Sequence, residues 1–186
     1  MRVLGLCGSL RRDSYNRCLL AAAARELPDA AVFQVFDEID EIPPYNEDTE
    51  ASETPAAVQA LRNALAAASA IVIATPEYNA SVPGFLKNAI DWASRSYLDH
   101  VLRGKPVAVV GASPSAFGAT QAQSDLRRVL KATGAQVLEA ELPVSRAYEA
   151  FLANGRLADP QLRSQLAIMV HDLLSMTAVD AVQACA

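Results

Sequence analysis

Residues that build metal centres or disulfide frameworks are scarce in this 186-residue sequence. The cysteines are Cys7, Cys18 and Cys185, an odd number without metal-ligand spacing, and the two histidines, His100 and His171, are far apart in the chain. We therefore predict no metal site. We expect Cys7 to pack in a strand, Cys18 to lie in a helix, and Cys185 to lie in a loose tail.

Long apolar segments are also missing. No run approaches the roughly 20 residues that a membrane span requires. The start, Met1-Arg2-Val3, shows no basic leader followed by an apolar segment and a cleavage site. These features predict a cytoplasmic protein that binds no membrane. The length, with 52% hydrophobic and 20% charged residues, predicts a single domain over residues 1–186.

Basic surface is scarce as well. The formal net charge is −5, and the stretch from Asp37 to Glu53 holds eight acidic residues and no basic one, which leaves about +3 for the remainder. We interpret the acidic stretch as a solvated face. The acidic balance and the lack of a basic, aromatic-interleaved surface argue against nucleic-acid binding.

What is present is a repeated strand and helix pattern, which predicts an α/β fold with a five-stranded, mostly parallel sheet and helices on both faces. The predicted strands are Val3–Cys7, Ala31–Phe36, Ala70–Thr75, Pro106–Ala112 and Ala135–Leu142. The predicted helices cover about Tyr15–Leu27, 55–68 with Thr54 as N-cap and Pro55 at the first helical position, Phe85–Ser94, Gln121–Thr133 with Gly134 at its end, and a last helix from Asp159-Pro160.

The loop after the first strand has the features of an anion site. It runs from Gly8 to Asn16 and precedes a helix, whose first N–H groups and dipole favour a phosphate. The sequence contains neither G-x-x-x-x-G-K-[ST] nor G-x-G-x-x-G. A low-molecular-weight phosphatase is disfavoured because Asp13 stands where its arginine would follow Cys7. An ordinary turn with a capping serine remains the alternative for this stretch alone.

Two further loops are expected at the same edge of the sheet. In parallel sheets ligands bind beyond the carboxyl ends of the strands, where the strand order reverses. The loop over 75–84 contains Tyr78, which offers a flat face for a conjugated ligand, or else covers the sheet edge as a surface residue. The loop over 111–120 is rich in serine and glycine. Together the loops predict a flat, phosphate-bearing ligand, and FMN fits better than a bare phosphate or a sugar.

These motifs resemble the NADPH-dependent FMN reductase family, the flavodoxin-like quinone, azo and chromate reductases. The resemblance extends over nearly the whole chain and rests on two separate motifs. They are Gly8-Ser9-Leu10-Arg11 with Ser14 and Asn16, and Pro76-Glu77-Tyr78-Asn79 with Ser81, Pro83-Gly84 and Leu86-Lys87-Asn88-Ala89-Ile90-Asp91-Trp92. The implied fold is a flavodoxin-like doubly wound sheet.

The resemblance also implies the cofactor-binding residues. The first motif would hold the FMN phosphate, the second would wrap the isoalloxazine ring chiefly through backbone groups, and the third loop would close the other flank. The implied residues are Ser9, Leu10, Arg11, Ser14, Asn16, Pro76, Glu77, Tyr78, Asn79, Ser113 and Gly118. The segment Pro44-Tyr45-Asn46-Glu47-Asp48 looks like the family's segment near the dimer interface, and a homodimer or homotetramer is implied.

The implied activity is hydride transfer from NADPH or NADH through FMN to a small-molecule acceptor such as a quinone, an azo compound, chromate or free flavin, in a ping-pong cycle. The chemistry belongs to the cofactor, so no catalytic acid or base is named. Two alternatives stay open. One is a flavodoxin-type electron carrier without nicotinamide activity, which the arginine-bearing first loop disfavours. The other is a binding module that has kept the fold and lost the flavin.

Overall fold

The computed structural model describes residues 1–95 and 99–183. The predicted loose tail around Cys185 therefore lies outside the described residues. Cys7 is buried in the first strand and Cys18 lies in the first helix, as predicted.

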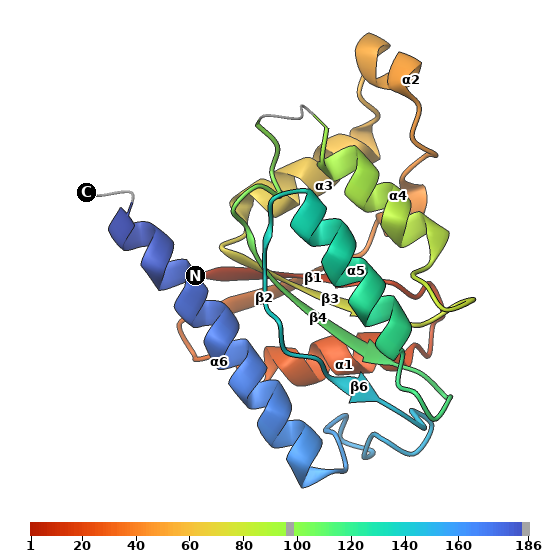
Figure 1. Ribbon diagram of the computed structural model, residues 1–186, viewed down its shortest axis with the longest axis vertical. Coiled ribbons are helices and arrows are strands. Elements are labelled where there is room, and N and C mark those ends of the chain that lie inside the picture. Colours follow the sequence, from red (N-terminus) through yellow and green to blue (C-terminus); the bar gives the residue numbers. More distant parts are fainter. Residues whose placement is uncertain (96–98, 184–186) are drawn as a thin grey trace.

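A parallel sheet forms the centre of the molecule (Figure 1). Its strands are β1 (Arg2–Cys7), β2 (Val32–Phe36), β3 (Ala70–Thr75), β4 (Pro106–Ala112), β5 (Gln136–Val137) and β6 (Pro143–Val144). The order is β2-β1-β3-β4-β5, with β6 also paired to β4, and every pairing is parallel. This order is that of flavodoxin-like sheets, whose switch point lies between β1 and β3. The predicted fold class is confirmed.

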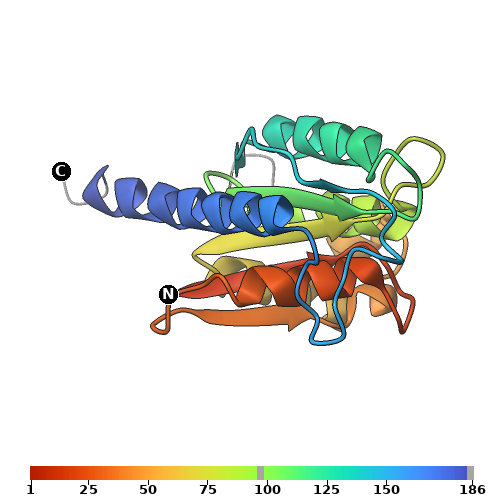
Figure 2. The same cartoon turned by 90° about the horizontal axis from the view of Figure 1, so that it is seen from below.

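Helices cover both faces of the sheet (Figures 1 and 2). The helical elements are α1 (Tyr15–Ala24), the 3-10 turn η1 (Ile39–Glu41), α2 (Glu47–Ser52), α3 (Ala56–Ala67), α4 (Gly84–Ala93), α5 (Thr120–Ala132) and α6 (Pro160–Gln183). One apolar core lies beneath α1 and α6, and a second lies beneath α3, α4 and α5. No helix within residues 1–95 and 99–183 has the length and apolarity needed to cross a bilayer.

Strand alternation explains the two cores. In β3, Ile71 and Ile73 point to the core of α3 and α4, whereas the smaller Ala70, Val72 and Ala74 point to the core of α1. Successive strand residues face opposite sides, and a strand buried on both faces is apolar throughout. The smaller residues face α1, which packs on this side of β3.

The fifth strand differs from the prediction over Ala135–Leu142. It is present as two short pieces, β5 and β6, that pair with opposite ends of β4. Between them, Glu141 forms an ion pair with Arg127 on α5, and the N–H of Leu142 donates to the Gln123 side chain at 3.1 Å. These bonds to α5 replace strand pairing, which is why the pattern of one continuous strand was misleading.

The start of α3 also differs. Pro55, and not Thr54, occupies the N-cap position, and its carbonyl accepts from the N–H of Gln59 at 3.0 Å. Pro55 has ψ 145°, so it stands outside the helix, and α3 has no side-chain cap. The predicted end of α5 is confirmed, since Gly134 has φ 80° after the last turn.

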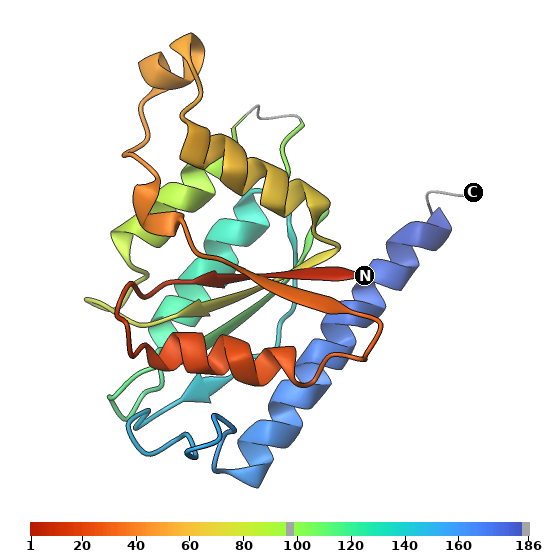
Figure 3. The ribbon, with the colours of Figure 1, turned by 180° about the vertical axis from the view of Figure 1, so that it is seen from behind.

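The acidic stretch contains η1, which packs on the core through the buried Ile39, and α2, which extends away from the body of the molecule. Helix α2 projects beyond the ends of α3 and α4 (Figures 1 and 3). None of the α2 residues is buried. Glu50 is bound at the base of this projection, where it accepts hydrogen bonds from Arg62 and from the Tyr45 hydroxyl. The predicted solvated face is confirmed for α2.

Candidate functional site

Three loops meet where the strands end, on the right in Figure 1 and on the left in Figure 3. They are the β1–α1 loop, the β3–α4 loop and the β4–α5 loop, and they enclose a crevice. The residues that line it are Ser9, Arg11, Ser14, Tyr15, Asn16, Pro76, Glu77, Tyr78, Ala112, Ser113 and Pro114. The crevice at the switch point thus holds eight of the eleven residues that the resemblance implies for the cofactor site.

The β1–α1 loop contributes hydroxyls and helix N–H groups. Ser9 and Ser14 are only 8% and 3% exposed. The Ser14 Oγ caps α1 by accepting from the N–H of Arg17 at 3.3 Å, and it also lies 3.9 Å from the Cys7 Sγ. In the described part of the chain the N–H groups of Tyr15 and Asn16 have no acceptor. The capping serine and the anion site are therefore compatible.

Arg11 lies at the mouth of the crevice. Its guanidinium is 5.6 Å from the centre of the Tyr15 ring and donates to the Asp13 carbonyl at 3.1 Å. Tyr15 in turn is stacked on Phe151, with ring centres 6.4 Å apart. These contacts hold a positive charge beside the N-terminus of α1 while the guanidinium still faces solvent.

Asn16 connects two of the loops. Its side-chain nitrogen donates to the Ala112 carbonyl at 2.9 Å, and its side-chain oxygen accepts from the Ala112 N–H at 3.0 Å. The residue is 3% exposed. It therefore ties the first turn of α1 to the end of β4, and one amide hydrogen is left for a ligand.

A tight hairpin forms the tip of the β3–α4 loop. Tyr78 and Ser81 exchange two backbone hydrogen bonds of 3.0 and 3.1 Å, and the residues between them, Asn79 and Ala80, have φ 52° and 60°. Both positive φ values match a type I′ turn. The hairpin presents the Tyr78 ring 53% exposed beside the crevice, whereas Asn79 lies at the exposed tip, outside the lining.

The β4–α5 loop places its two predicted residues differently. Ser113 is 7% exposed and lines the crevice, and its Oγ accepts from the N–H of Ser115 at 3.2 Å. Gly118 lies outside the lining and packs on β6. Its φ is 59°, and a Cβ there would come within 2.6 Å of the Pro143 carbonyl carbon. The close packing of the Gly118 backbone against Pro143 explains why a glycine stands at this position without reference to any ligand.

The remaining predicted residue, Leu10, is exposed and lines a neighbouring cavity at the carboxyl ends of β1 and β2, which Ser9 and Arg11 also line. There Arg17 forms an ion pair of 2.6 Å with Asp37, and the hydrogen bond to Asp37 raises the pKa of Arg17. The predicted site residues did not include Tyr15, Ala112 and Pro114, which also line the crevice. The position of Tyr15 between the two predicted residues Ser14 and Asn16 is the sequence feature that could have identified it.

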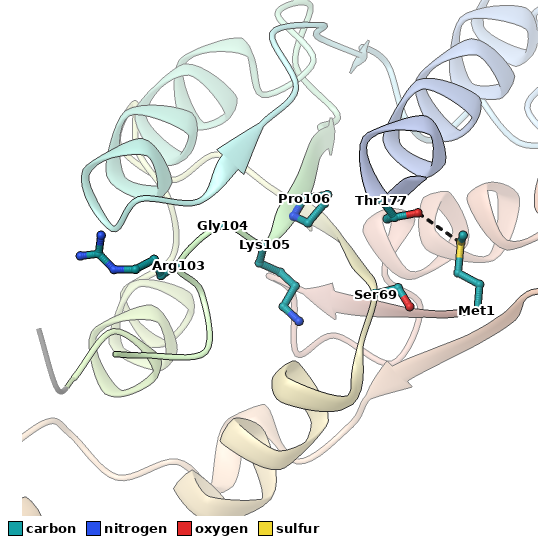
Figure 4. Close-up of a pocket in the computed structure, with 7 residues that line it drawn as sticks. All are labelled: Met1, Ser69, Arg103, Gly104, Lys105, Pro106 and Thr177. Carbon is teal, nitrogen blue, oxygen red and sulfur yellow. Dashed lines mark hydrogen bonds between the residues drawn. The ribbon is translucent and has the colours of Figure 1, made fainter. Parts of the chain in front are cut away.

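A larger cavity lies at the amino ends of the strands, far from these loops (Figure 4). It has a volume of about 380 Å³ and is lined in part by Ser69, Lys105 and Thr177. Lys105 donates to the Ala68 carbonyl at 2.5 Å, and burial lowers its pKa. The side chains of Arg103 and Lys105 point in different directions (Figure 4). Polar groups do not converge here as they do in the crevice.

Comparisons with known proteins agree with this geometry. Residues 1–149 match the family described as NADPH-dependent FMN reductase. An NAD(P)H-dependent FMN reductase of Pseudomonas aeruginosa is 44% identical over 164 residues, which cover 88% of each chain. A quinone reductase of Escherichia coli K12 is 40% identical over 139 residues, 74% of this chain and 73% of the relative.

A solved structure extends the agreement to the fold. The flavoenzyme NAD(P)H:acceptor oxidoreductase from Paracoccus denitrificans superposes with a TM-score of 0.83 at 33% identity, covering 95% of this chain and 97% of that one. The predicted oxidoreductase class and the predicted use of FMN and NAD(P)H are confirmed. The chain belongs to the NADPH-dependent FMN reductase family.

Proposed function

We propose that the crevice holds FMN and that the protein passes electrons from NAD(P)H to quinones. One observation carries this proposal. Buried hydroxyls and N–H groups without acceptors, at the start of α1, lie in the same crevice as the exposed Tyr78 of the β3–α4 loop. A phosphate requires the first set of groups, and a flat conjugated ring requires the second.

The phosphate end of FMN is assigned to the β1–α1 loop. Ser9, Ser14 and Arg11 supply donors of the kind that a phosphate dianion accepts, and the dipole of α1 adds to them. Asn16 acts mainly by holding α1 to β4, with one N–H left for the cofactor. Leu10 belongs to the same loop and supplies backbone rather than side chain.

The ring end is assigned to the other two loops. Pro76, Glu77, Tyr78 and Asn79 are proposed to follow one edge of the isoalloxazine, chiefly through backbone groups. Ser113 is proposed to close the other flank from the β4–α5 loop, and Gly118 shapes the same loop by packing on β6.

When bound, FMN would supply the redox chemistry between a nicotinamide donor and an acceptor. The protein's part is to bind and orient. No side chain in the crevice is assigned as an acid or base. Because the crevice opens to solvent beside Tyr78, donor and acceptor are proposed to use the same open face in turn, which is a ping-pong cycle.

Quinones are the proposed acceptors because several relatives are named as quinone reductases. Cytoplasmic localisation, a homodimer or homotetramer, and one FMN-binding domain over residues 1–186 complete the proposal. One sheet carries both apolar cores, which supports a single domain.

Steady-state kinetics with NADPH and benzoquinone test the catalytic part. Parallel lines in double-reciprocal plots at several benzoquinone concentrations are expected for the ping-pong cycle. Intersecting lines would contradict it, and flavin that NADPH reduces without turnover of any quinone would remove quinones as acceptors.

Sedimentation at several protein concentrations gives the oligomeric state, and a monomer throughout would contradict the proposed assembly.

A further inference from the structure

Helix α5 begins without a cap of its own. The residue at its N-cap position is Ala119, in a left-handed conformation with φ 60°, and alanine has no side-chain acceptor. The first N–H groups of a helix need acceptors from outside the helix. At α5 these acceptors come from a different loop.

The acceptor is the side chain of Glu77. Its Oε2 accepts from the N–H of Gln121 at 2.9 Å and from the N–H of Ala122 at 3.1 Å. These are the second and third residues of α5, the positions that an N-cap side chain serves. The carboxylate also stands at the positive end of the helix dipole. Glu77 therefore replaces the cap that Ala119 lacks.

A second bond joins the same loop to the same helix. The Ser81 hydroxyl donates to Asp125 Oδ2 at 2.5 Å, about one turn further along α5. Asp125 is held in turn by Arg128. Glu77 and Ser81 stand on either side of the hairpin tip, so both ends of the Tyr78–Ser81 hairpin are attached to α5.

The Glu77 attachment starts in the crevice, because Glu77 is one of the residues that line it. Tyr78 and Ser113 line the same crevice, on the β3–α4 loop and on the β4–α5 loop that leads into α5. We propose that Glu77 is a positioning residue, whose side chain caps α5 and thereby fixes the spacing of the two flanks that receive the flavin ring. This inference rests on the proposed FMN site and assigns the Glu77 side chain to the helix rather than to the cofactor.

The test compares Glu77→Ala with Glu77→Gln. A glutamine keeps an oxygen that can accept both N–H groups, whereas alanine keeps none. We expect E77A apoprotein to bind FMN roughly 10-fold more weakly, as loss of charge-assisted bonds predicts, and E77Q to stay within about threefold of wild type. Fluorescence titration of FMN with apoprotein measures both.

Hydrogen exchange of the apoprotein reports on the cap itself. The amides of Gln121 and Ala122 are expected to exchange faster in E77A and to stay close to wild type in E77Q. Glu139→Ala is the matched control, because Glu139 pairs with Lys131 near the other end of α5, and it should change neither FMN affinity nor these amides.

The results distinguish failure of this inference from failure of the proposed function. Faster exchange in E77A with unchanged FMN affinity would make Glu77 a structural cap only and overturn the inference. A wild-type protein that binds no FMN would overturn the proposed function together with it. If E77A does not fold, Ser81→Ala provides the same test through the second attachment, and a loss of FMN affinity of about two- to fivefold is expected. Unchanged affinity in S81A would then count against the inference.

Discussion

The polar side chains of the crevice have two different roles. Both polar atoms of the Asn16 side chain hydrogen-bond to the backbone of Ala112, and one oxygen of Glu77 accepts hydrogen bonds from two N–H groups of α5. Arg11 and Ser9 instead face the space between the loops. A substitution therefore has different consequences according to whether the residue holds the loops together or faces the ligand.

Arg11→Ala should weaken FMN binding without a comparable loss of stability. Arg11 is exposed, and its main contribution is a charge beside the N-terminus of α1, so about 10-fold weaker binding is expected from loss of a charge-assisted contact. Titration of apoprotein with FMN measures it. Arg25→Ala is the control, since Arg25 has the same charge and is exposed, but lies at the other end of α1 and outside the crevice lining. Equal affinity of R11A and wild type would remove Arg11 from the site.

Asn16→Ala should destabilise the fold. The substitution leaves the buried N–H and carbonyl of Ala112 without their partner, which costs about 1–3 kcal/mol for each group left unsatisfied. Urea unfolding of the apoprotein gives the free energy of unfolding. Asn63→Ala, at an exposed position on α3, should change it by less than about 0.5 kcal/mol. A stable N16A protein would show that water takes over both bonds.

At the scale of elements, the hairpin of the β3–α4 loop contains a residue that its turn type disfavours. Ala80 has φ 60°, a conformation that glycine adopts without steric cost. Ala80→Gly should therefore raise the free energy of unfolding, by up to about 1 kcal/mol, because relief of strain exceeds the added entropy of the unfolded chain.

The control for this prediction is an alanine to glycine change at ordinary helical φ. Ala66 is exposed near the end of α3, and Ala66→Gly should lower the free energy of unfolding by roughly 0.5–1 kcal/mol. Opposite signs for the two substitutions in thermal or urea unfolding are expected. A loss at both positions would mean that the turn is not strained.

The attachment of the hairpin to α5 should depend on pH in the acid range. The hydrogen bond from Ser81, followed by that from Arg128, lowers the pKa of Asp125 below its ordinary value of 3.8. A carboxyl with a lowered pKa in the folded state stabilises the fold above its ordinary pKa, and that contribution disappears as the pH falls through the lowered value.

Asp125→Asn removes the titrating group and measures this effect. Wild type should exceed D125N in free energy of unfolding at neutral pH, and the difference should shrink as the pH falls below 3.8. Urea unfolding at several pH values gives the comparison. A difference that stays constant from pH 7 to pH 3 would show that the Asp125 charge does not stabilise the attachment.

At the scale of the whole molecule, the parallel sheet and the helices on both of its faces were predictable, because strand and helix patterns involve residues that are close together in the sequence. The loops after β1, β3 and β4 were predictable as neighbours because parallel strands end at one edge. The cap from Glu77 to α5 was not, since it joins residues 44 positions apart. The interruption of the fifth strand likewise depends on Gln123 and Arg127, which lie on another element.

The property that most directly tests the proposed function is the reduction of bound FMN by NADPH. The visible absorption spectrum of the protein reconstituted with FMN, recorded before and after anaerobic addition of NADPH, measures it. Flavin bands that bleach when NADPH is added are expected. Flavin bands that persist would indicate an electron carrier without nicotinamide activity, and a protein that retains no FMN after reconstitution would contradict the assignment of the crevice.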